Sequence, residues 1–152
     1  MHAALIALHA TTGLVALLAG ALCVRRRSYL PLYFGALVSC IVFLAAAVAV
    51  GWSDLSGGTR VLFVAFLALG AFMIWRGARA RGLWPADAVE PSARYFDHLG
   101  FTLVALTDAF VVIAVLDLGA PGWVVAVIGV LGAAIGHRAI QTLKQRPSGR
   151  TS

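Results

Sequence analysis

Five long apolar runs, separated by short polar segments, constrain this chain more than any other feature. A helix needs about 20 mostly apolar residues to cross the hydrocarbon core of a bilayer. The runs cover residues 3–24, 30–50, 61–75, 99–118 and 122–140. The third is short, but Arg60 and Arg76 at its two ends can extend their side chains outward to the headgroups. The sequence therefore predicts an all-α integral membrane protein with five transmembrane helices.

The basic residues predict how these helices are oriented. Eleven of the twelve Lys and Arg residues follow the first run, lie between the third and fourth, or lie at or after the end of the fifth, and only Arg60 falls on the other side. Loops rich in Lys and Arg are retained on the cytoplasmic side of a membrane. The pattern predicts an N-terminus outside and a C-terminus in the cytoplasm.

The composition excludes a soluble domain and indicates that the chain contacts lipid. The chain is 61% hydrophobic and 12% charged, whereas soluble domains average about 45–50% apolar and about 25% charged residues. Its formal net charge of +6 sits at the ends of the runs without interleaved aromatic residues. That placement favours contact with the anionic lipid headgroups of the bilayer and gives no indication of nucleic-acid binding.

The domain organisation follows from the spacing of the runs. Residues 1–145 are predicted to form one five-helix domain, and residues 146–152 a disordered cytoplasmic tail that is polar and contains Pro and Gly. Pro91-Ser92 is typical of a helix start, so the helix that contains the fourth run is expected to begin one or two turns early, inside the cytoplasm. Cys23 and Cys40 fall within or at the inner end of runs, and no disulfide is expected.

Two helix faces are lined with small residues. Gly129, Gly132 and Gly136 lie within about 60° of one another around the fifth helix, and Gly13 and Gly20 share a face of the first helix with His9. Membrane helices associate closely through such faces. We expect both faces to pack against a neighbouring helix within the chain, in a homo-oligomer, or in a complex with a partner membrane subunit.

Asp108 is the principal candidate functional residue. It falls near the bilayer centre, where an ionised carboxylate costs about 2.5–3.5 kcal/mol or more. The sequence offers no Lys or Arg at that depth. Asp108 is therefore either protonated and hydrogen-bonded or directed into a wet cavity. Its expected neighbours are Thr107, Thr12 and His9, with His9 close enough in depth for a bridged pair if the first and fourth helices are adjacent.

His98 and His137 form a second candidate set. The fourth run begins near His98 and the fifth ends near His137, so the two are expected at one depth on consecutive helices. Two imidazoles in that arrangement are suited to a haem iron or another metal. The alternative is that each is only a polar residue at a helix end. Haem b is the one cofactor that the sequence suggests, and none is firmly indicated.

Three segments resemble a known family. Asp97-His98-Leu99-Gly100, the segment from Leu106 to Val112, and the pattern from His9 through Gly13 and Gly20 to a basic turn are similar to those of small multi-span bacterial membrane proteins of unassigned function. The resemblance implies a bacterial inner-membrane protein with several helices. Relatives often carry a His near the start of the second span, where this chain has Tyr29-Leu30-Pro31.

These observations favour a small transport or proton-coupled membrane protein. In this hypothesis Asp108 takes up and releases a proton, His9 relays it toward the outer face, and Thr107 or Thr12 orients them. One alternative is a b-type haem protein for electron transfer that uses His98 and His137. Another is a non-catalytic membrane subunit or scaffold that binds partner helices. The sequence shows no nucleotide-binding loop, zinc-protease motif or nucleophile elbow, so an enzyme is unsupported.

Overall fold

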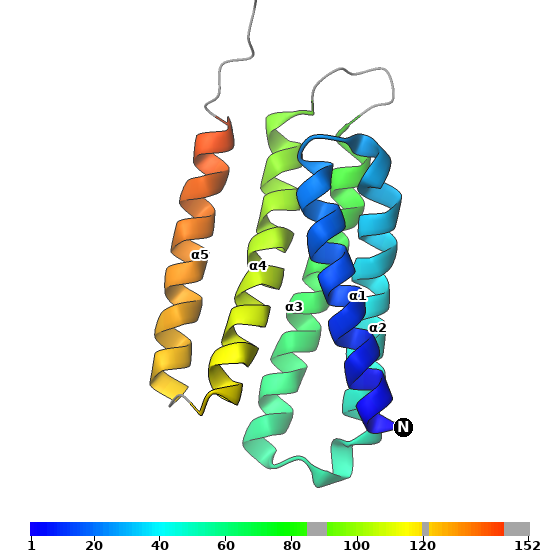
Figure 1. Ribbon diagram of the computed structural model, residues 1–152, viewed down its shortest axis with the longest axis vertical. Coiled ribbons are helices and arrows are strands. Elements are labelled where there is room, and N and C mark those ends of the chain that lie inside the picture. The colour runs from blue at the N-terminus through cyan, green and yellow to red at the C-terminus, as the bar shows by residue number, and fades with distance from the viewer. Residues whose placement is uncertain (85–90, 120–121, 145–152) are drawn as a thin grey trace, which may run out of the picture. The chain divides into compact units, whose positions relative to one another are not determined.

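The computed structural model describes residues 1–84, 91–119 and 122–144, which are almost entirely helical. Its long helices are α1 (His2–Cys23), α2 (Leu30–Val50), α3 (Gly57–Gly82), α4 (Ala93–Asp117) and α5 (Gly122–Lys144) (Figure 1). Two short 3₁₀ helices, η1 (Arg27–Tyr29) and η2 (Trp52–Asp54), flank α2. The prediction of an all-α protein with five helices is confirmed.

Four segments are long and apolar enough to cross a membrane. They are His2–Cys23, Arg27–Val50, Gly57–Gly82 and Ala93–Val115. Each is at least 22 residues long, and about 20 apolar residues suffice to span the hydrocarbon core. A membrane protein is therefore indicated by length and composition. A fifth crossing by α5 and the orientation of the chain stay predictions.

The helix ends follow local sequence signals. Pro31 lies in the first turn of α2, where a missing N–H breaks no helical hydrogen bond. The hydroxyl of Ser92 accepts a hydrogen bond from the Tyr95 N–H at 3.3 Å, which caps the start of α4. The helix start predicted at Pro91-Ser92 is thus confirmed. After α4, Gly119 has a φ of 79°, a left-handed conformation that commonly ends a helix.

The third helix is longer than predicted. It has 26 residues and ends at Gly82, whereas the apolar run covers only residues 61–75. The apolar run marks only the part of the helix expected in the hydrocarbon core, and the arginines and alanines that follow it are good helix formers. Two of these arginines also lie on aromatic rings. The guanidinium carbon of Arg79 is 5.4 Å from the centre of the Trp75 ring, and that of Arg81 is 4.8 Å from the Phe34 ring. Such contacts let the charged end of an apolar helix stay helical while the charge remains accessible.

The chain divides into two compact units, Met1–Arg81 and Gly82–Ser152. The first contains α1, α2 and nearly all of α3, and the second contains α4 and α5. Whether the units together make up the single domain predicted for residues 1–145 stays a prediction. The predicted tail, residues 146–152, lies outside the described residues.

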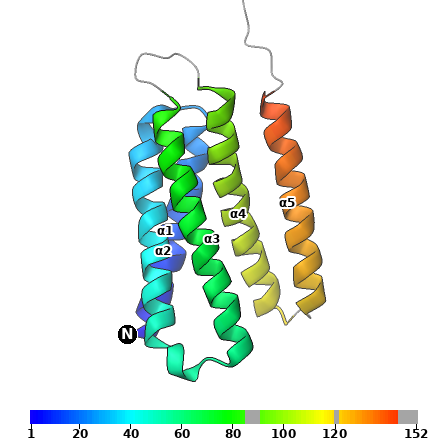
Figure 2. The same ribbon diagram turned by 180° about the vertical axis from the view of Figure 1, so that it is seen from behind.

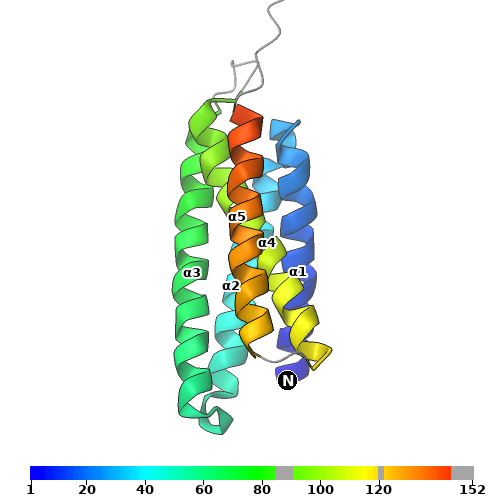
Figure 3. The same cartoon turned by 90° about the vertical axis from the view of Figure 1, so that its left-hand side faces the viewer.

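In the first unit, α1 and α2 run antiparallel and pack closely (Figure 1). The buried residues of α1 are nearly all small: Gly13, Ala16, Ala19, Gly20 and Cys23. Helix α3 packs on α2 at two glycines, where an added Cβ at Gly70 would lie 2.7 Å from Ile41 and one at Gly77 3.2 Å from Phe34. The N-terminus and the α2–α3 connection lie at the same end of this unit (Figure 3).

In the second unit, α4 and α5 form an antiparallel hairpin (Figure 2). Trp84, which precedes the segment outside the described residues, packs edge-on against Tyr95 at 5.2 Å between ring centres. One row of α4 is buried: Tyr95, Leu99, Thr102 and Leu106. The Thr102 hydroxyl donates a hydrogen bond to the Leu99 carbonyl at 2.8 Å, which accounts for a polar side chain at a fully buried position.

Candidate functional site

Helices α4 and α5 meet along a ridge of small and branched residues. An added Cβ at Gly100 would contact Ile140, one at Gly136 would contact Val104, and one at Gly132 would contact Asp108. On both helices these positions are four residues apart, so each set forms one face. Two of the α5 glycines predicted to pack therefore lie directly against α4. Gly129 belongs to the same helix, but its surroundings lie outside the described part of the chain.

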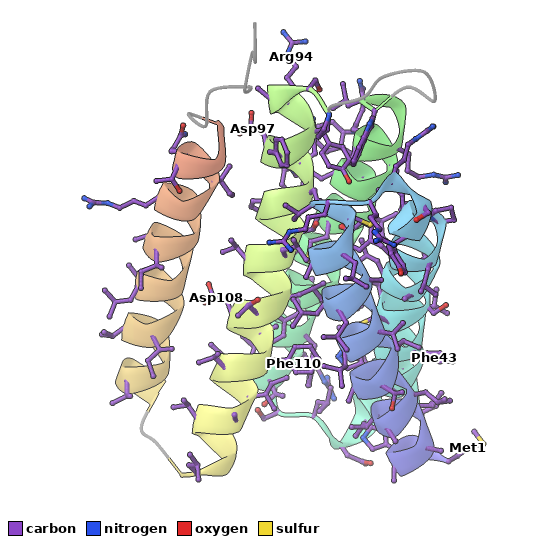
Figure 4. All side chains as sticks on the ribbon, turned by 45° about the horizontal axis from the view of Figure 1, so that its top comes forward. Met1, Phe43, Arg94, Asp97, Asp108 and Phe110 are labelled. Atoms are coloured by element: carbon purple, nitrogen blue, oxygen red, sulfur yellow. The ribbon has the colours of Figure 1, made fainter. Side chains whose placement is uncertain are left out.

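The carboxyl group of Asp108 lies directly over the backbone of Gly132. A Cβ at that glycine would be 2.7 Å from the Asp108 Cγ and 3.0 Å from Oδ2, so any side chain there would displace the carboxyl group. Figure 4 shows Asp108 on the side of α4 that faces α5. Asp108 lies nine residues before the end of α4, which is about 13 Å along the helix axis. The carboxyl group is therefore far from the end of a membrane-length helix, α4, and is accommodated by a glycine of α5.

This carboxyl group has no polar partner within residues 1–84, 91–119 and 122–144: it makes no hydrogen bond or ion pair there. The sequence of α5 offers none at the same level, since Gly129, Gly132 and Ala133 have no polar side chain. Buried polar groups that serve only structure are almost always hydrogen-bonded. A half-buried, unpartnered carboxyl group inside an apolar helix pair is instead typical of a group that meets protons, ions or water.

The threonines predicted to orient the site bond to their own helices. The Thr107 hydroxyl donates to the Leu103 carbonyl at 2.9 Å, and the Thr12 hydroxyl donates to the Leu8 carbonyl at 2.7 Å. Such bonds satisfy the hydroxyl within the apolar helix. The role of these threonines toward Asp108 stays a prediction.

The imidazole of His9 contacts Cys40, which lies at the centre of α2. Its Nδ1 lies 2.9 Å from the Cys40 carbonyl oxygen and 3.3 Å from the Cys40 sulfur. Because a carbonyl can only accept, Nδ1 carries the ring proton and Nε2 keeps its lone pair. Across the described residues, no hydrogen bond to Nε2 is formed.

The expected pairing of His9 with Asp108 stays a prediction. His9 belongs to the first unit and Asp108 to the second. What the structure adds is the state of each group taken alone. His9 presents an Nε2 that has no hydrogen bond to a described residue, and the Asp108 carboxyl group has no hydrogen bond to one either.

In the α4–α5 hairpin, His98 and His137 lie at different levels along the helix axes. Since Gly100 faces Ile140, His98 is level with Thr142, five residues beyond His137, or about 7.5 Å along the axis. His98 also lies about 160° around α4 from Gly100, away from the face that contacts α5. The side chain of His137 lies outside the described residues. Haem ligation by this pair stays a prediction that the hairpin does not support.

Metal-binding side chains are not gathered into a larger cluster. Among the residues that the structure describes, no group of three or more His, Cys, Asp or Glu side chains could hold a metal ion. Cys23 and Cys40 are both free thiols.

Six arginines gather at one end of the first unit. They belong to the α1–α2 connection and to the last turns of α3, which lie at the same end (Figure 1). The residues are Arg25, Arg26, Arg27, Arg76, Arg79 and Arg81. Arg60 lies near the other end, with its guanidinium carbon 5.4 Å from the centre of the Trp52 ring. Within this unit, the positive charge is thus strongly asymmetric.

Sequence reasoning missed Cys40 as a neighbour of His9. Cys40 was considered only for disulfide formation, because nothing in its immediate sequence marks it. A positional signal was available: counting equally from the two sides of the α1–α2 connection places His9 opposite Leu44, and Cys40 is one helical turn away. Polar residues at similar depth in consecutive antiparallel helices are therefore worth pairing.

The comparisons with known proteins do not extend this picture. No protein-family model, curated protein or solved structure matches the chain. The resemblance to small bacterial membrane proteins of unassigned function therefore stays a prediction. The function has to come from the chemistry of the site itself.

Proposed function

We propose that this chain is a small proton-coupled transport protein of a bacterial inner (plasma) membrane and that Asp108 is its proton carrier. The proposal depends on one observation: the Asp108 carboxyl group lies in a membrane-length helix and has no polar partner in the described part of the chain. Gly132 provides the space that the carboxyl group occupies.

The chemistry follows from the cost of charge in an apolar medium. An ionised carboxylate without a partner is strongly disfavoured there, so Asp108 is neutral when the helix pair is dry. When water reaches the group from one side, the carboxylate is solvated and the proton is released. A carboxyl group that alternates between these environments carries a proton, whereas one fixed by hydrogen bonds would keep a single state.

The other polar residues have secondary roles in this proposal. His9 accepts a proton on Nε2, because its Nδ1 is already bonded to the Cys40 carbonyl oxygen, and relays the proton toward the outer face. Thr107 and Thr12 would orient these groups by exchanging their bonds to backbone carbonyls. The pathway between His9 and Asp108 is part of the proposal.

The charge asymmetry supports the proposed orientation, with the N-terminus outside and the C-terminus in the cytoplasm. The six arginines at one end of the first unit would face the cytoplasm and the anionic headgroups of the inner leaflet. The N-terminus and Arg60 would lie outside. Reporter domains fused to the C-terminus test this: we expect a cytoplasmic reporter to be active there and a periplasmic one to be inactive. The reverse pattern would contradict the orientation.

The scaffold alternative has less support than transport. Its α5 glycine face, which would have to bind a partner helix, is occupied by α4 at Gly132 and Gly136. Its α1 face, with Gly13 and Gly20, is buried within the structure. Copurification of a stoichiometric membrane partner would nevertheless favour a scaffold.

The deciding experiment measures proton flux in proteoliposomes. Purified protein is reconstituted with a pH-sensitive dye inside the vesicles, a pH gradient is imposed, and valinomycin with K⁺ compensates the charge. We expect the wild type to dissipate the gradient faster than empty vesicles, and Asp108→Asn to fall to the rate of empty vesicles. Asp108→Asn keeps the size of the side chain and removes only the titratable proton.

Asp54→Asn is the matched control. Asp54 is an exposed carboxyl group in η2 whose Oδ1 accepts a hydrogen bond from the Ser53 hydroxyl at 3.3 Å. It lies outside the spans, so we expect its removal to leave the flux unchanged. A wild type no faster than empty vesicles, or an Asp108→Asn variant as fast as the wild type, would contradict the proposal.

A further inference from the structure

Two groups of arginines at one end of the first unit carry positive charge that the acidic residues of that unit do not balance. One group lies in the α1–α2 connection and the other in the last turn of α3: Arg25, Arg26, Arg27, Arg79 and Arg81. Among residues 1–81 the only acidic residue is Asp54, and it lies in η2 at the opposite end (Figure 1). Asp87 and Glu90 follow in the sequence, but two carboxylates cannot neutralise five guanidinium groups. A surface of this kind attracts an anionic partner.

Helix α2 brings the two groups together. The guanidinium carbon of Arg81 lies 4.8 Å from the centre of the Phe34 ring, and an added Cβ at Gly77 would lie 3.2 Å from the same ring. Phe34 belongs to the second turn of α2, which directly follows the α1–α2 connection. The end of α3 therefore packs beside the segment that carries the other three arginines.

Aromatic rings position the arginines of α3. The guanidinium carbon of Arg79 lies 5.4 Å from the centre of the Trp75 ring, and that of Arg81 lies on Phe34. An arginine contacts a ring through the face of its guanidinium group, whereas phosphate oxygens bind the N–H groups at its edge, often two at once. The ring contact therefore does not compete with a phosphate, and a side chain that is already positioned loses less entropy on binding.

Exposed apolar side chains lie next to these arginines. Leu22 in the last turn of α1 is 49% exposed, Leu32 in the first turn of α2 is 54% exposed, and Trp75, one turn before Arg79, is 48% exposed. Acyl chains would cover these side chains, whereas a free phosphate ion would leave them exposed. The combination of cations and adjacent apolar surface thus matches a phospholipid, and basic sites at the cytoplasmic ends of membrane helices bind such headgroups.

We propose that this end of the first unit is a binding site for one phospholipid that carries two phosphate groups, a lipid of the cardiolipin class. One phosphate binds the arginines of the α1–α2 connection, and the other binds Arg79 and Arg81. Once the first phosphate is bound, the second is held close to its own arginines, so the whole molecule binds more tightly than two separate lipids. A lipid with one phosphate contacts only one group at a time.

The lipid site goes beyond the proposed function, because it uses neither Asp108 nor proton movement. It also differs from the general effect of positive charge on orientation. That effect depends on how many Lys and Arg residues lie on one side of the membrane, so it gives no preference between anionic lipids. A preference for two linked phosphates requires the two groups of arginines to act together.

The experiment measures lipid binding to the purified full chain in a neutral detergent after removal of copurified lipid. Cardiolipin and phosphatidylglycerol are titrated separately, and native mass spectrometry counts the lipids bound to each chain. We expect one cardiolipin per chain, bound at least about 10-fold more tightly than phosphatidylglycerol. Excess inorganic phosphate should not displace it. Equal affinity for the two lipids, or displacement by inorganic phosphate, would overturn the proposal.

Two double variants test the two groups of arginines separately. Arg25→Gln with Arg26→Gln, and Arg79→Gln with Arg81→Gln, should each abolish the preference for cardiolipin and lower its affinity about fivefold for each arginine removed. Arg25 and Arg26 are exposed, so the first variant tests the site with little effect on folding.

Arg60→Gln is the matched control, because it removes the same charge from the opposite end of the unit. Its affinity for cardiolipin should equal that of the wild type. Asp108→Asn should also bind cardiolipin normally, which separates this proposal from the proton-flux measurement. An unchanged preference in either double variant, or an equal loss in Arg60→Gln, would show that the two groups do not form the site.

Discussion

The α1–α2 pair and the α4–α5 pair treat their intramembrane polar groups in opposite ways. Both are antiparallel, and both approach closely through small residues. In the first pair, His9 and Thr12 are hydrogen-bonded to backbone carbonyls, and the Cys40 sulfur lies 3.3 Å from Nδ1 of His9. In the second, the Asp108 carboxyl group rests on Gly132 without a hydrogen bond to any described residue.

The difference shows how donor chemistry limits what a helix pair can do in a membrane. A neutral imidazole, hydroxyl or thiol can be satisfied by carbonyl oxygens that the helices already provide, so it costs little. A carboxylate cannot be satisfied by a carbonyl, because both are acceptors. The polar groups of the α1–α2 pair are therefore satisfied within the helices, and the α4–α5 pair suits a proton that comes and goes.

The largest effect on stability is expected at Gly132. In Gly132→Ala the new methyl group would occupy the space of the Asp108 carboxyl group, and overpacking of this kind costs about 1–3 kcal/mol. Thermal unfolding of the purified protein in one detergent should show a lower midpoint. Gly132→Ala combined with Asp108→Ala removes the clash and should recover most of the loss.

Gly35→Ala is the matched control for that change. Gly35 is also inside a helix, but a Cβ there would meet nothing within 4 Å. Ala has the higher helix propensity and restricts the unfolded chain, so this variant should be unchanged or more stable by about 0.4–1 kcal/mol. If both glycine variants shift the midpoint of unfolding equally, the Asp108 carboxyl group does not occupy the space above Gly132. The difference drawn between the α1–α2 and α4–α5 pairs would then be wrong.

A smaller effect is expected from the α1–α2 pair. His9→Ala removes the hydrogen bond to the Cys40 carbonyl, and a net loss of about 0.5–1.5 kcal/mol is typical for one such bond. Cys40→Ala leaves that bond intact, since the acceptor is the backbone, so it should cost less than His9→Ala. Midpoints of unfolding in the same detergent give the order. A larger loss in Cys40→Ala would mean that the thiol, and not the carbonyl, holds the imidazole.

The sequence alone predicts the helices, but it does not predict which groups their polar side chains contact. Apolar length and Pro or Gly signals predict the five helices, because burial in lipid and helix termination are local properties. The apolar run of residues 61–75 did not give the ends of α3, because a helix can continue beyond its apolar part through good helix formers such as Arg and Ala. The position of Cys40 beside His9 depends on the register of two helices, which no single segment of the sequence contains.

Asp108 shows both what a sequence can predict and what it cannot. A carboxylate in an apolar run has a high free-energy cost wherever its partners lie, so Asp108 could be singled out without a structure. Its contact with Gly132 requires the antiparallel register of α4 and α5. The glycine spacing predicts that a smooth face exists, but not that a carboxyl group lies against it.

The smallest effect is expected at the two histidines of the hairpin. The register separates His98 from His137 by about 7.5 Å along the axis, and His98 lies on the face of α4 away from Gly100 and α5. We therefore expect the protein, purified after expression with haem supplied, to show no Soret band before or after reduction with dithionite. A Soret band that is lost in His98→Ala or His137→Ala would show that this hairpin binds haem. The α4–α5 pair would then be an electron carrier, and the unpartnered Asp108 carboxyl group would have to be explained as part of a haem site instead of a proton path.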